Sequence, residues 1–600
     1  MLKRFLEQAM KDEPVYITDV REAFGREGTL PFDLAITLYD GSTRFFPMML
    51  PVTHSREEKD FVCSYIKATV YNLLSSLGGE KMEIFTDTQD ICLMDLARSL
   101  PEIFQSDIPK FGRSGYGKCM NVNDRVLTAL FGDNRKFSFM IRDSKERPDH
   151  FKDPHETGPE QEHCGESGIF SRLPVLAGDR MLLGIDVGGT DIKLAAAAGG
   201  KLVLCKEYDW FPAGFSLVSE MTDPIMLLVR LMRCGSCLYA SGKEEFVDRL
   251  SFTKDASAEQ MMEGIRKMEA AAGEDLRGFD AIGLSFPDVV IRNRIVGGEC
   301  HKFKGMRDNT KLDFEKQFAK VSGLNELLRA YVTPDGAVMS TNDGPMAAFT
   351  SAVELAAAHE DVSKGFFAHT LGTELGTGWV LPDGSIPELP LEVYNFIIDL
   401  GSFGQKKLPS SDVRSINNIN TQLPGTLQKY TCQSGVFRLA AKYLPGEDPQ
   451  VFEEALEKGL FIRTSDGGLE VPVSPRDMRK SALEFFMEKA AGGEHPVCER
   501  IFREIGEYLA VTWQETEYIL HPEAKSRSLY GRLVKVPACF NQIRQGARSR
   551  VPGIEFFAAD SSLANTVYMR QLDTHPDFTV AQFAQAVGAI YFGCLGLVSE

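Results

Sequence analysis

Runs of apolar and polar residues predict two similar hairpins in the middle of the chain. In the first, an apolar run over 181–185 ends at Asp186, a Gly-Gly-Thr turn occupies 188–190, and apolar residues resume over 192–198. In the second, residues 366–386 again read as an apolar strand, a turn rich in glycine and threonine, and another apolar strand. Apolar runs on either side of glycine turns are typical of strand, tight turn and strand.

Each hairpin has the composition of a phosphate-binding turn. Glycines carry no Cβ, so their backbone N–H groups can approach a phosphate closely, and a threonine adds a hydroxyl donor. Asp186, at the end of the first strand, is placed to hold a hydrated Mg²⁺, which keeps several waters and takes one or two carboxylates. Two such turns facing each other would hold a polyphosphate from both sides. For either turn alone, an ordinary glycine hairpin is the alternative.

The residues before the first hairpin predict an α+β region of unknown role. Residues 33–50 read as strand, Asp-Gly turn and strand, and 57–76 carries apolar residues at helical spacing. A strand over 81–85 and a helix over 90–104 follow. A stretch rich in Pro, Glu, Asp, His and Gly then predicts a linker near 143–178.

After the first hairpin, the pattern is mostly helical over 206–278, with helices predicted over 224–233 and 258–272, and we interpret this stretch as an insertion. The pattern then returns to a buried strand over 279–288. Further on, a short strand leads to Asn342-Asp343 and into a helix of small residues that begins near Pro345, a favoured first helical residue. Asp is also a common helix N-cap, so capping is the alternative to a chemical role for Asp343. Helical patterns dominate the C-terminal third.

Composition is that of a soluble globular protein of several domains. The 600 residues, 43% hydrophobic and 25% charged, suggest about three domains. Residues at the start of the chain lack the apolar core of a signal peptide, and no run reaches the roughly 18 apolar residues of a membrane span, so we expect a cytoplasmic protein without membrane contact. The formal net charge of −18 argues against a nucleic-acid partner, which needs a basic face.

The cysteines predict reduced thiols, because 12 of them are scattered along the chain without a dense framework. Cys234 and Cys237 form the only closely spaced pair. Half of a zinc site and a redox pair are the two chemical interpretations, but no second CxxC or His-x₃-His partner lies nearby.

Taken together, these motifs resemble those of the ROK sugar kinases. The segment GIDVGGTDIK, residues 184–193, resembles the family's first phosphate motif, and TLGTELGTG, residues 370–378, resembles its second. Asn342-Asp343 followed by a small-residue helix resembles its catalytic motif. The resemblance implies an α/β, two-lobed actin-like (ribonuclease H-like) ATPase fold of the actin, hexokinase and Hsp70 superfamily.

The resemblance covers residues 180–600 and implies a division of the chain into three parts. Residues 1–178 form an additional N-terminal α+β domain that ends in the linker. Residues 179–345 form the first actin-like lobe, with the helical insertion over 206–278. Residues 346–600 form the second lobe.

The resemblance also implies an ATP-dependent kinase that phosphorylates a hydroxyl of a sugar or sugar-like polyol. Asp343 would accept the proton of the attacking hydroxyl, and Asn342 would orient that hydroxyl. Asp186 would hold Mg²⁺ through water, and Glu392 and Asn395 would bind sugar hydroxyls. The residues implied for the nucleotide are Gly188, Gly189, Thr190, Lys193, Gly372, Thr373, Gly376, Gly378 and Gly531.

Cofactors and partners follow from the same resemblance. We expect ATP and Mg²⁺, and no structural zinc, because the cysteine-rich zinc motif of many relatives is absent. The expected partner is a small sugar or polyol, and a homodimer is left open. His301, Lys302 and Lys304 lie where the family's sugar-approaching loop would be, either as polar contacts or as solvated surface.

Three positions depart from the family pattern. Asp288 replaces a glycine of the sugar loop, and Tyr530 replaces the first glycine of a pair that borders the adenosine. Glu374 places a carboxylate beside the expected γ-phosphate, where like charge would repel ATP. These departures motivate a second hypothesis from another class, a catalytically silent sugar- or nucleotide-sensing protein of the same fold.

Overall fold

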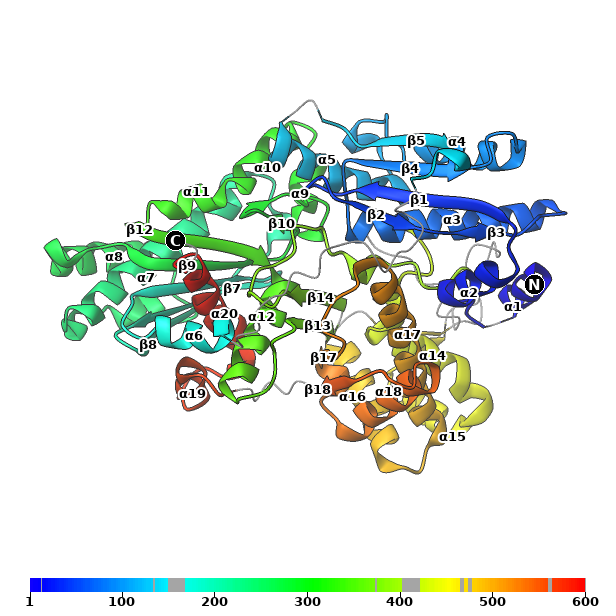
Figure 1. The fold of residues 1–600 in the computed structure, drawn as a ribbon. Helices are drawn as coiled ribbons and strands as arrows, with labels where there is room; N and C mark the ends of the chain where they lie inside the picture. The colour runs from blue at the N-terminus through cyan, green and yellow to red at the C-terminus, as the bar shows by residue number, and fades with distance from the viewer. Residues whose placement is uncertain are drawn as a thin grey trace. The chain divides into compact units, whose positions relative to one another are not determined.

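The computed structural model describes residues 1–11, 13–132, 135–148, 168–372, 375–401, 421–463, 469–472, 477–558 and 564–598. The chain divides into two compact units, each built around mixed α/β structure (Figure 1). The first unit comprises Met1–Gln161, His369–Thr377 and Leu389–Ala558, and the second comprises Glu162–Ala368, Gly378–Glu388 and Ala559–Glu600. Within the described ranges, no helix is both long enough and apolar enough to cross a membrane.

The second unit is built on a five-stranded sheet in the order β12-β9-β6-β7-β8. The β12–β9 and β9–β6 pairs are parallel, whereas β6–β7 and β7–β8 are antiparallel. The first predicted hairpin is therefore confirmed as β6 and β7. The strands of this unit are β6 (Leu182–Val187), β7 (Asp191–Ala198), β8 (Lys201–Asp209), β9 (Phe279–Phe286), β10 (Val290–Ile291), β11 (Arg294–Ile295) and β12 (Val332–Asn342).

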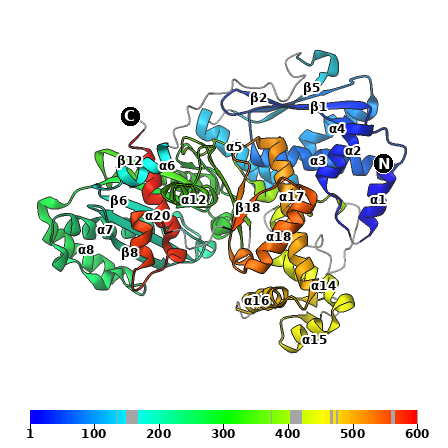
Figure 2. The ribbon, with the colours of Figure 1, turned by 60° about the horizontal axis from the view of Figure 1, so that its bottom comes forward.

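Helices cover both faces of this sheet (Figure 2). Leu183 and Ile185 of β6 share a buried core with α7 and α8. The alternate residue Gly184 faces α20, which comes so close that a Cβ on Gly184 would lie 1.8 Å from the carbonyl oxygen of Ala586. Asp186 has the same parity as Gly184 and lies on the α20 face. The helices of the unit are α6 (Gly168–Leu176), α7 (Val218–Ala240), α8 (Ala258–Ala272), α9 (Lys304–Asp308), α10 (Phe314–Ser322), α11 (Leu324–Arg329), α12 (Asp343–Ala357), α19 (Val567–Asp573) and α20 (Val580–Leu595).

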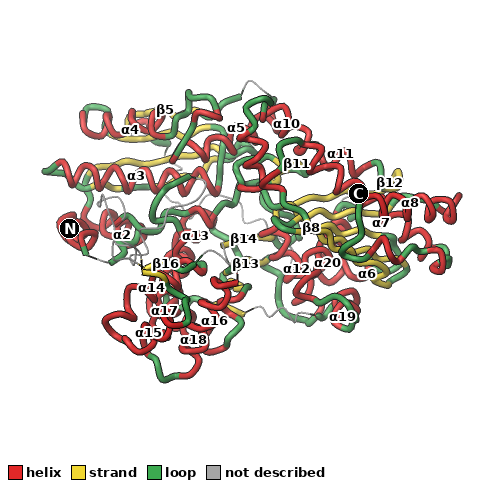
Figure 3. Tube along the Cα trace, turned by 180° about the vertical axis from the view of Figure 1, so that it is seen from behind, coloured by secondary structure: helices red, strands yellow, loops and turns green. Residues whose placement is uncertain are grey.

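The N-terminal part of the first unit holds a mixed sheet with the strand order β2-β1-β4-β5, and β3 pairs with β1. The long helix α3 runs alongside its strands (Figure 3). The hairpin, helix, strand and helix predicted over 33–104 are confirmed. The elements are α1 (Leu2–Met10), α2 (Ile17–Glu27), β1 (Leu30–Thr37), β2 (Thr43–Phe46), β3 (Met49–Leu50), α3 (Arg56–Ser76), β4 (Lys81–Thr86), α4 (Ile91–Ile103), α5 (Lys118–Phe131) and β5 (Ser138–Asp143).

The remainder of the first unit is mainly helical, as the C-terminal pattern predicts. A four-stranded sheet has the order β14-β13-β17-β18, so the second predicted hairpin is confirmed as β13 and β14; of this hairpin, residues 369–377 belong to the first unit, and 366–368 and 378–380 belong to the second. The elements are β13 (Phe366–Leu371), β14 (Leu375–Val380), α13 (Leu427–Tyr430), α14 (Gln433–Glu447), α15 (Pro449–Glu457), β15 (Ile462–Arg463), β16 (Leu469–Glu470), α16 (Asp477–Gly492), α17 (Pro496–Leu520), β17 (Arg527–Tyr530), α18 (Pro537–Arg550) and β18 (Phe556–Ala558).

The predicted division into three domains stays a prediction, because a compact unit can contain more than one domain. Residues 1–161 and 389–558 lie in the same unit. Most of the predicted linker, 149–167, lies outside the described residues, but its end is the helix α6 rather than irregular chain.

Candidate functional site

Three parallel strands of the second unit end in polar side chains at the same edge of the sheet. Asp186 of β6 lies opposite Ser285 of β9, and Ser285 lies opposite Thr341 of β12. Asn342 and Asp343 follow at the junction of β12 and α12. Ligands of α/β sheets bind at the carboxyl ends of parallel strands. The residues predicted for the metal and for the base thus end strands on either side of β9.

Asp186 lies in a locally negative environment. Ser285 Oγ donates a hydrogen bond to Asp186 Oδ1 at 2.9 Å. Burial raises the pKa of Asp186 to about 6; Ser285 and Lys193 oppose this shift, and the charges of Asp343 and Asp191 add to it. Asp186 and Asp343 are therefore close enough for their charges to repel, and a cation at this edge would relieve the repulsion. Ser285 was missed by sequence reasoning, although its place at the end of a buried strand was visible.

Asn342, rather than Asp343, caps α12. Asn342 Oδ1 accepts a hydrogen bond from the Gly344 N–H at 3.0 Å, and Asn342 Nδ2 donates to the Asp288 carbonyl oxygen at 2.7 Å. Asp343 is half-buried, and its carboxylate makes no hydrogen bond or ion pair within the described part of the chain. Asn342 therefore caps the helix, and the Asp343 carboxylate is available to a ligand.

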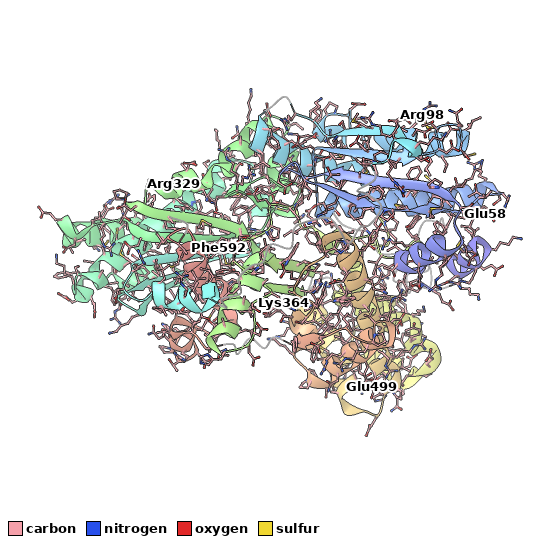
Figure 4. The ribbon with its side chains drawn as sticks, in the orientation of Figure 1. Glu58, Arg98, Arg329, Lys364, Glu499 and Phe592 are labelled. Carbon is pink, nitrogen blue, oxygen red and sulfur yellow. The ribbon has the colours of Figure 1, made fainter. Side chains whose placement is uncertain are left out.

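The position of Asp343 is fixed by the packing of α12 against α20. A Cβ on Gly588 of α20 would lie 1.8 Å from Thr350 Oγ1 of α12, so the Thr350 side chain packs directly on the backbone of α20. One helical turn away, the rings of Phe349 and Phe592 pack edge to face with centroids 5.0 Å apart; Phe592 is labelled in Figure 4. Because α20 is in turn seated on the sheet, the first residue of α12 has little freedom to move.

The turn between β6 and β7 presents two unbonded amides. The Gly188 N–H donates to the Asp191 carbonyl oxygen at 2.8 Å, and Trp210 holds the outer side of the turn through its indole N–H to the Gly188 carbonyl oxygen at 3.0 Å. The N–H groups of Gly189 and Thr190 make no hydrogen bond to any described residue. Adjacent free amides can donate to an anion, but the binding of phosphate by this turn stays a prediction.

The two lysines near this turn have different surroundings. Lys193 forms an ion pair with Asp191, which also accepts a hydrogen bond from Thr190 Oγ1 at 3.1 Å, so Lys193 is already neutralised. Lys302 reaches over the turn, since a Cβ on Gly189 would lie 3.2 Å from its Cε. Among the described residues, the Lys302 ammonium has no hydrogen bond or ion pair. Lys302 is thus the better placed of the two to meet an anion.

Asp288 has a structural role at this edge. It is buried, its Oδ1 accepts from the Val289 N–H at 2.8 Å, and its Oδ2 accepts from the Gly298 N–H at 2.6 Å. A Cβ on Gly297 would lie 1.8 Å from Asp288 Oδ1, so the loop closes tightly around the carboxylate. The loop that Asp288 closes also positions Asn342, whose amide bonds to the Asp288 carbonyl oxygen.

The glycines of the second hairpin serve packing as well as any ligand. A Cβ on Gly378 of β14 would lie 2.0 Å from the Gly344 carbonyl oxygen, so β14 rests on the first turn of α12. The Gly372 carbonyl oxygen accepts from the Gln433 N–H at 3.1 Å, and Gly376 has only ordinary contact with Thr370. Thr373 and Glu374 lie outside the described residues, so the effect of the Glu374 carboxylate stays a prediction.

Gly531 and Tyr530 belong to the first unit. Gly531 has φ of 101°, and a Cβ there would lie 2.2 Å from the Leu371 carbonyl oxygen, so only glycine fits where this turn meets the end of β13. Burial raises the pKa of the half-buried Tyr530 phenol above its ordinary value. A nucleotide contact by Gly531 stays a prediction.

Glu392 and Asn395, the predicted sugar ligands, lie on one short loop of the first unit. Glu392 is half-buried and its Oε1 accepts a hydrogen bond from the Tyr394 hydroxyl at 2.7 Å. Asn395 is buried, and its N–H donates to the Glu392 carbonyl oxygen at 2.9 Å. Since this loop and Asp343 belong to different units, their joint action on one substrate stays a prediction.

No group of three or more His, Cys, Asp or Glu in the described ranges is arranged to hold a metal ion. A hydrated Mg²⁺ does not need such a group, because one or two carboxylates, water and substrate phosphates complete its octahedron. Cys234 and Cys237 lie buried on α7 as free thiols, and burial raises the pKa of both, that of Cys234 to about 12.

Comparisons with known proteins give structural likeness only. No protein-family model matches the chain, and no curated protein does. Among solved structures, a ROK hexokinase from Thermus thermophilus matches 70% of this chain and 100% of its own, with 14% identity and a TM-score of 0.36. Glucokinase from Leishmania braziliensis matches 71% and 98%, with 10% identity and a TM-score of 0.36. Glucokinase from Parabacteroides distasonis matches 66% and 98%, with 15% identity and a TM-score of 0.33.

Proposed function

We propose that this protein transfers the γ-phosphoryl group of ATP to a hydroxyl of a sugar or sugar-like polyol, with Mg²⁺ as cofactor and Asp343 as general base. One observation carries the proposal: Asp343, a carboxylate without a partner among the described residues, lies within electrostatic range of Asp186 at the carboxyl edge of the β12-β9-β6 strands. The resemblance of the surrounding motifs to those of ROK sugar kinases supports the same reaction.

The chain's own residues supply the parts that phosphoryl transfer requires. Such enzymes mainly position the reactants and stabilise charge, so one base together with phosphate-binding donors is sufficient. The Asp343 carboxylate would accept the proton of the attacking hydroxyl, as a general base does. Asn342 retains one N–H and one lone pair beyond its two structural hydrogen bonds, enough to orient the same hydroxyl.

The residues present fit ATP and Mg²⁺. The free amides of Gly189 and Thr190 and the unpaired ammonium of Lys302 offer donors to phosphate oxygens. Asp186 offers oxygen ligands; burial first, and then the charges of Asp343 and Asp191, raise its pKa, so a cation beside it would be favourable. When bound, Mg²⁺ would neutralise charge on the phosphates.

A coupled ADP-release assay with MgATP against hexoses, N-acetylated hexosamines and polyols tests the proposal. We expect turnover with one of these acceptors and its loss in Asp343→Asn, which keeps the shape of the side chain and removes the base. Asp335→Asn is the matched control, since Asp335 is an exposed carboxylate near the other end of the same strand, β12.

Each outcome of this assay assigns the protein to one class. Full activity in Asp343→Asn, with the fold intact, would contradict the role of Asp343. Binding of MgATP without turnover of any acceptor would favour the second hypothesis, a catalytically silent sugar- or nucleotide-sensing protein.

A further inference from the structure

The N-terminal part of the first unit is bonded directly to the loop that carries Glu392 and Asn395. The Val15 N–H donates to Asp399 Oδ1 at 2.7 Å, and the Leu400 N–H donates back to the Val15 carbonyl oxygen at 2.8 Å. The Ile17 N–H continues the pairing to the Ile398 carbonyl oxygen at 3.0 Å. A segment near the start of the chain thus pairs with this loop as a neighbouring strand would.

Asn72 clamps the centre of the same loop. The Ile397 N–H donates to Asn72 Oδ1 at 2.7 Å, and Asn72 Nδ2 donates to the Ile397 carbonyl oxygen at 3.1 Å. This side chain is fully buried on α3 and so replaces water for both backbone groups of Ile397. Removing it would leave two buried backbone groups unpaired, which native structures rarely tolerate.

The orientation of Asn72 is itself fixed by a buried ion pair. Asn72 Nδ2 also donates to Glu515 Oε1 of α17 at 2.9 Å. Arg21 of α2 forms an ion pair with Glu515 Oε2 at 2.6 Å. The Cζ atom of Arg21 lies 3.9 Å from the centroid of the Tyr518 ring. Glu515 of α17 and Arg21 of α2 therefore help to hold this amide of α3 in place.

The end of α3 also bonds to the residues that begin the loop. The N–H groups of Leu391 and Glu392 donate to the carbonyl oxygens of Ser76 and Ser75, each at 3.1 Å. These carbonyls belong to the last turn of α3, where the helix itself supplies no donor. The loop thus supplies donors to the last carbonyl oxygens of α3, and the same two hydrogen bonds fix the backbone of Glu392.

Two side chains of the N-terminal segment lie within electrostatic range of the Glu392 carboxylate. Burial, and then the charge of Glu392, raise the pKa of the Cys119 thiol on α5. Burial, followed by the charges of Cys119 and Glu392, raise the pKa of the Tyr71 phenol on α3. The predicted sugar ligand therefore lies in an environment that residues before position 150 help to form.

We infer that the N-terminal segment, residues 1–148, is a scaffold that holds the 391–401 loop in its substrate-binding shape, with Asn72 as the positioning residue. The part of the inference that concerns sugar rests on the proposed function. Asn72 acts through the backbone of Ile397 and touches no reacting atom, so its loss affects the binding of the acceptor sugar more than the transfer step.

Asn123 provides a matched control. It is buried on α5 and clamps Gly79 in the same way, with Gly79 N–H to Asn123 Oδ1 and Asn123 Nδ2 to the Gly79 carbonyl oxygen both at 3.0 Å. Its third partner is the Tyr39 hydroxyl at 2.6 Å. Asn123→Ala therefore breaks an equivalent clamp inside the N-terminal segment, without touching the 391–401 loop.

The experiment compares wild-type protein, Asn72→Ala and Asn123→Ala, each as the full chain, by amide hydrogen exchange and by kinetics for the acceptor sugar. We expect exchange over 391–401 to accelerate at least tenfold in Asn72→Ala and to stay unchanged in Asn123→Ala. We also expect the sugar KM to rise at least tenfold in Asn72→Ala, with kcat within twofold of wild type. Asn72→Gln, which keeps both the amide donor and the amide acceptor but displaces them by one methylene, gives a smaller rise in the exchange rate and in the sugar KM, and it serves if Asn72→Ala does not fold.

Failure of this inference is distinguishable from failure of the proposed function. If wild-type protein phosphorylates no sugar, the kinase proposal fails, and exchange over 391–401 still decides whether the scaffold exists. Unchanged exchange over the loop in both Asn72 variants would overturn the inference, as would equal acceleration in Asn72→Ala and Asn123→Ala.

Discussion

Two regions of the molecule place an aspartate next to the end of an extended segment, and they differ in what the carboxylate bonds to. Asp399 is fully buried and accepts hydrogen bonds from the Val15 and Gly401 N–H groups, at 2.7 and 2.8 Å, and from the Tyr430 hydroxyl. Asp343 is half-buried, follows the end of β12 as the first residue of α12, and has no such partner among the described residues. A carboxylate whose acceptors are satisfied by its own chain stabilises the fold, whereas one left open at a strand edge is available to a ligand.

The largest expected effect is on catalysis at the open carboxylate. Asp343→Asn removes the base, and general-base catalysis contributes about 10²- to 10⁴-fold, so we expect kcat to fall by about that factor. The melting temperature should stay near that of wild type because no described hydrogen bond is lost. If the melting temperature of Asp343→Asn fell as far as that of a variant in the buried core, Asp343 would stabilise the fold as Asp399 does. The difference between the two carboxylates would then not exist.

The next largest effect is on stability at the satisfied carboxylate. Asp399→Ala leaves three donors without their acceptor, and each unpaired buried group costs about 1–3 kcal/mol, so the free energy of unfolding should fall by about 3 kcal/mol or more. Denaturant titration measures this. Asp361→Ala, at an exposed carboxylate that accepts only a local hydrogen bond from Ser363, is the control and should leave the free energy of unfolding nearly unchanged.

Asp186, whose carboxylate has one hydrogen bond from Ser285, is intermediate between Asp343 and Asp399. The pH dependence of stability at Asp186 tests the comparison further. Burial raises its pKa in the folded state to about 6, so the folded protein favours the protonated form. This contribution to stability is complete below the ordinary carboxyl pKa and is lost as the pH rises through about 6. Asp186→Asn should therefore melt above wild type at pH 8 without Mg²⁺, by a few degrees.

Mg²⁺ should make the melting temperature of wild-type protein higher than that of Asp186→Asn. Added with ATP at pH 8, it should raise the melting temperature of wild-type protein and have little effect on Asp186→Asn. Equal Mg²⁺-dependent stabilisation of both would show that Asp186 does not serve the metal. Thermal melts at pH 5 and pH 8, with and without Mg²⁺ and ATP, measure both the pH dependence of stability and the stabilisation by Mg²⁺.

The smallest expected effect concerns Lys302. Lys302→Met keeps the length of the side chain and removes the ammonium above the Gly189 turn, so the KM for ATP should rise about tenfold, the equivalent of about 1.4 kcal/mol. Lys304→Met is the control, because Lys304 is exposed and already paired with Asp308. An equal KM for ATP in both variants would mean that the ammonium of Lys302 lies in solvent.

Local features of the site could be predicted from the sequence. The turn at Gly188-Gly189 and the junction at Asn342-Asp343 are set by neighbouring residues, because glycine turns and helix starts depend on backbone preferences over a few positions. For the same reason the helix α8 was predicted with its observed bounds, Ala258–Ala272. For Asp343, the sequence left capping and chemistry open, and the cap turned out to be Asn342.

Long-range features could not be predicted in this way. Asn72 and Ile397 are 325 positions apart, and nothing in the pattern near either residue indicates that they meet. The same applies to Asp288, which reads as a departure from a family motif and proves to close its own loop through Gly298. Helix α7 begins at Val218, before the predicted start near Pro224, because its packing on the sheet outweighs the local effect of the proline.

The most direct test of the central claim is the fate of the γ-phosphate. With MgATP and the preferred acceptor, ³¹P NMR should show one sugar phosphate formed for each ADP released, with little inorganic phosphate. The same spectrum for Asp343→Asn should show ATP almost unchanged. Release of inorganic phosphate at the same rate with and without any sugar, in both proteins, would contradict phosphoryl transfer to a hydroxyl with Asp343 as base.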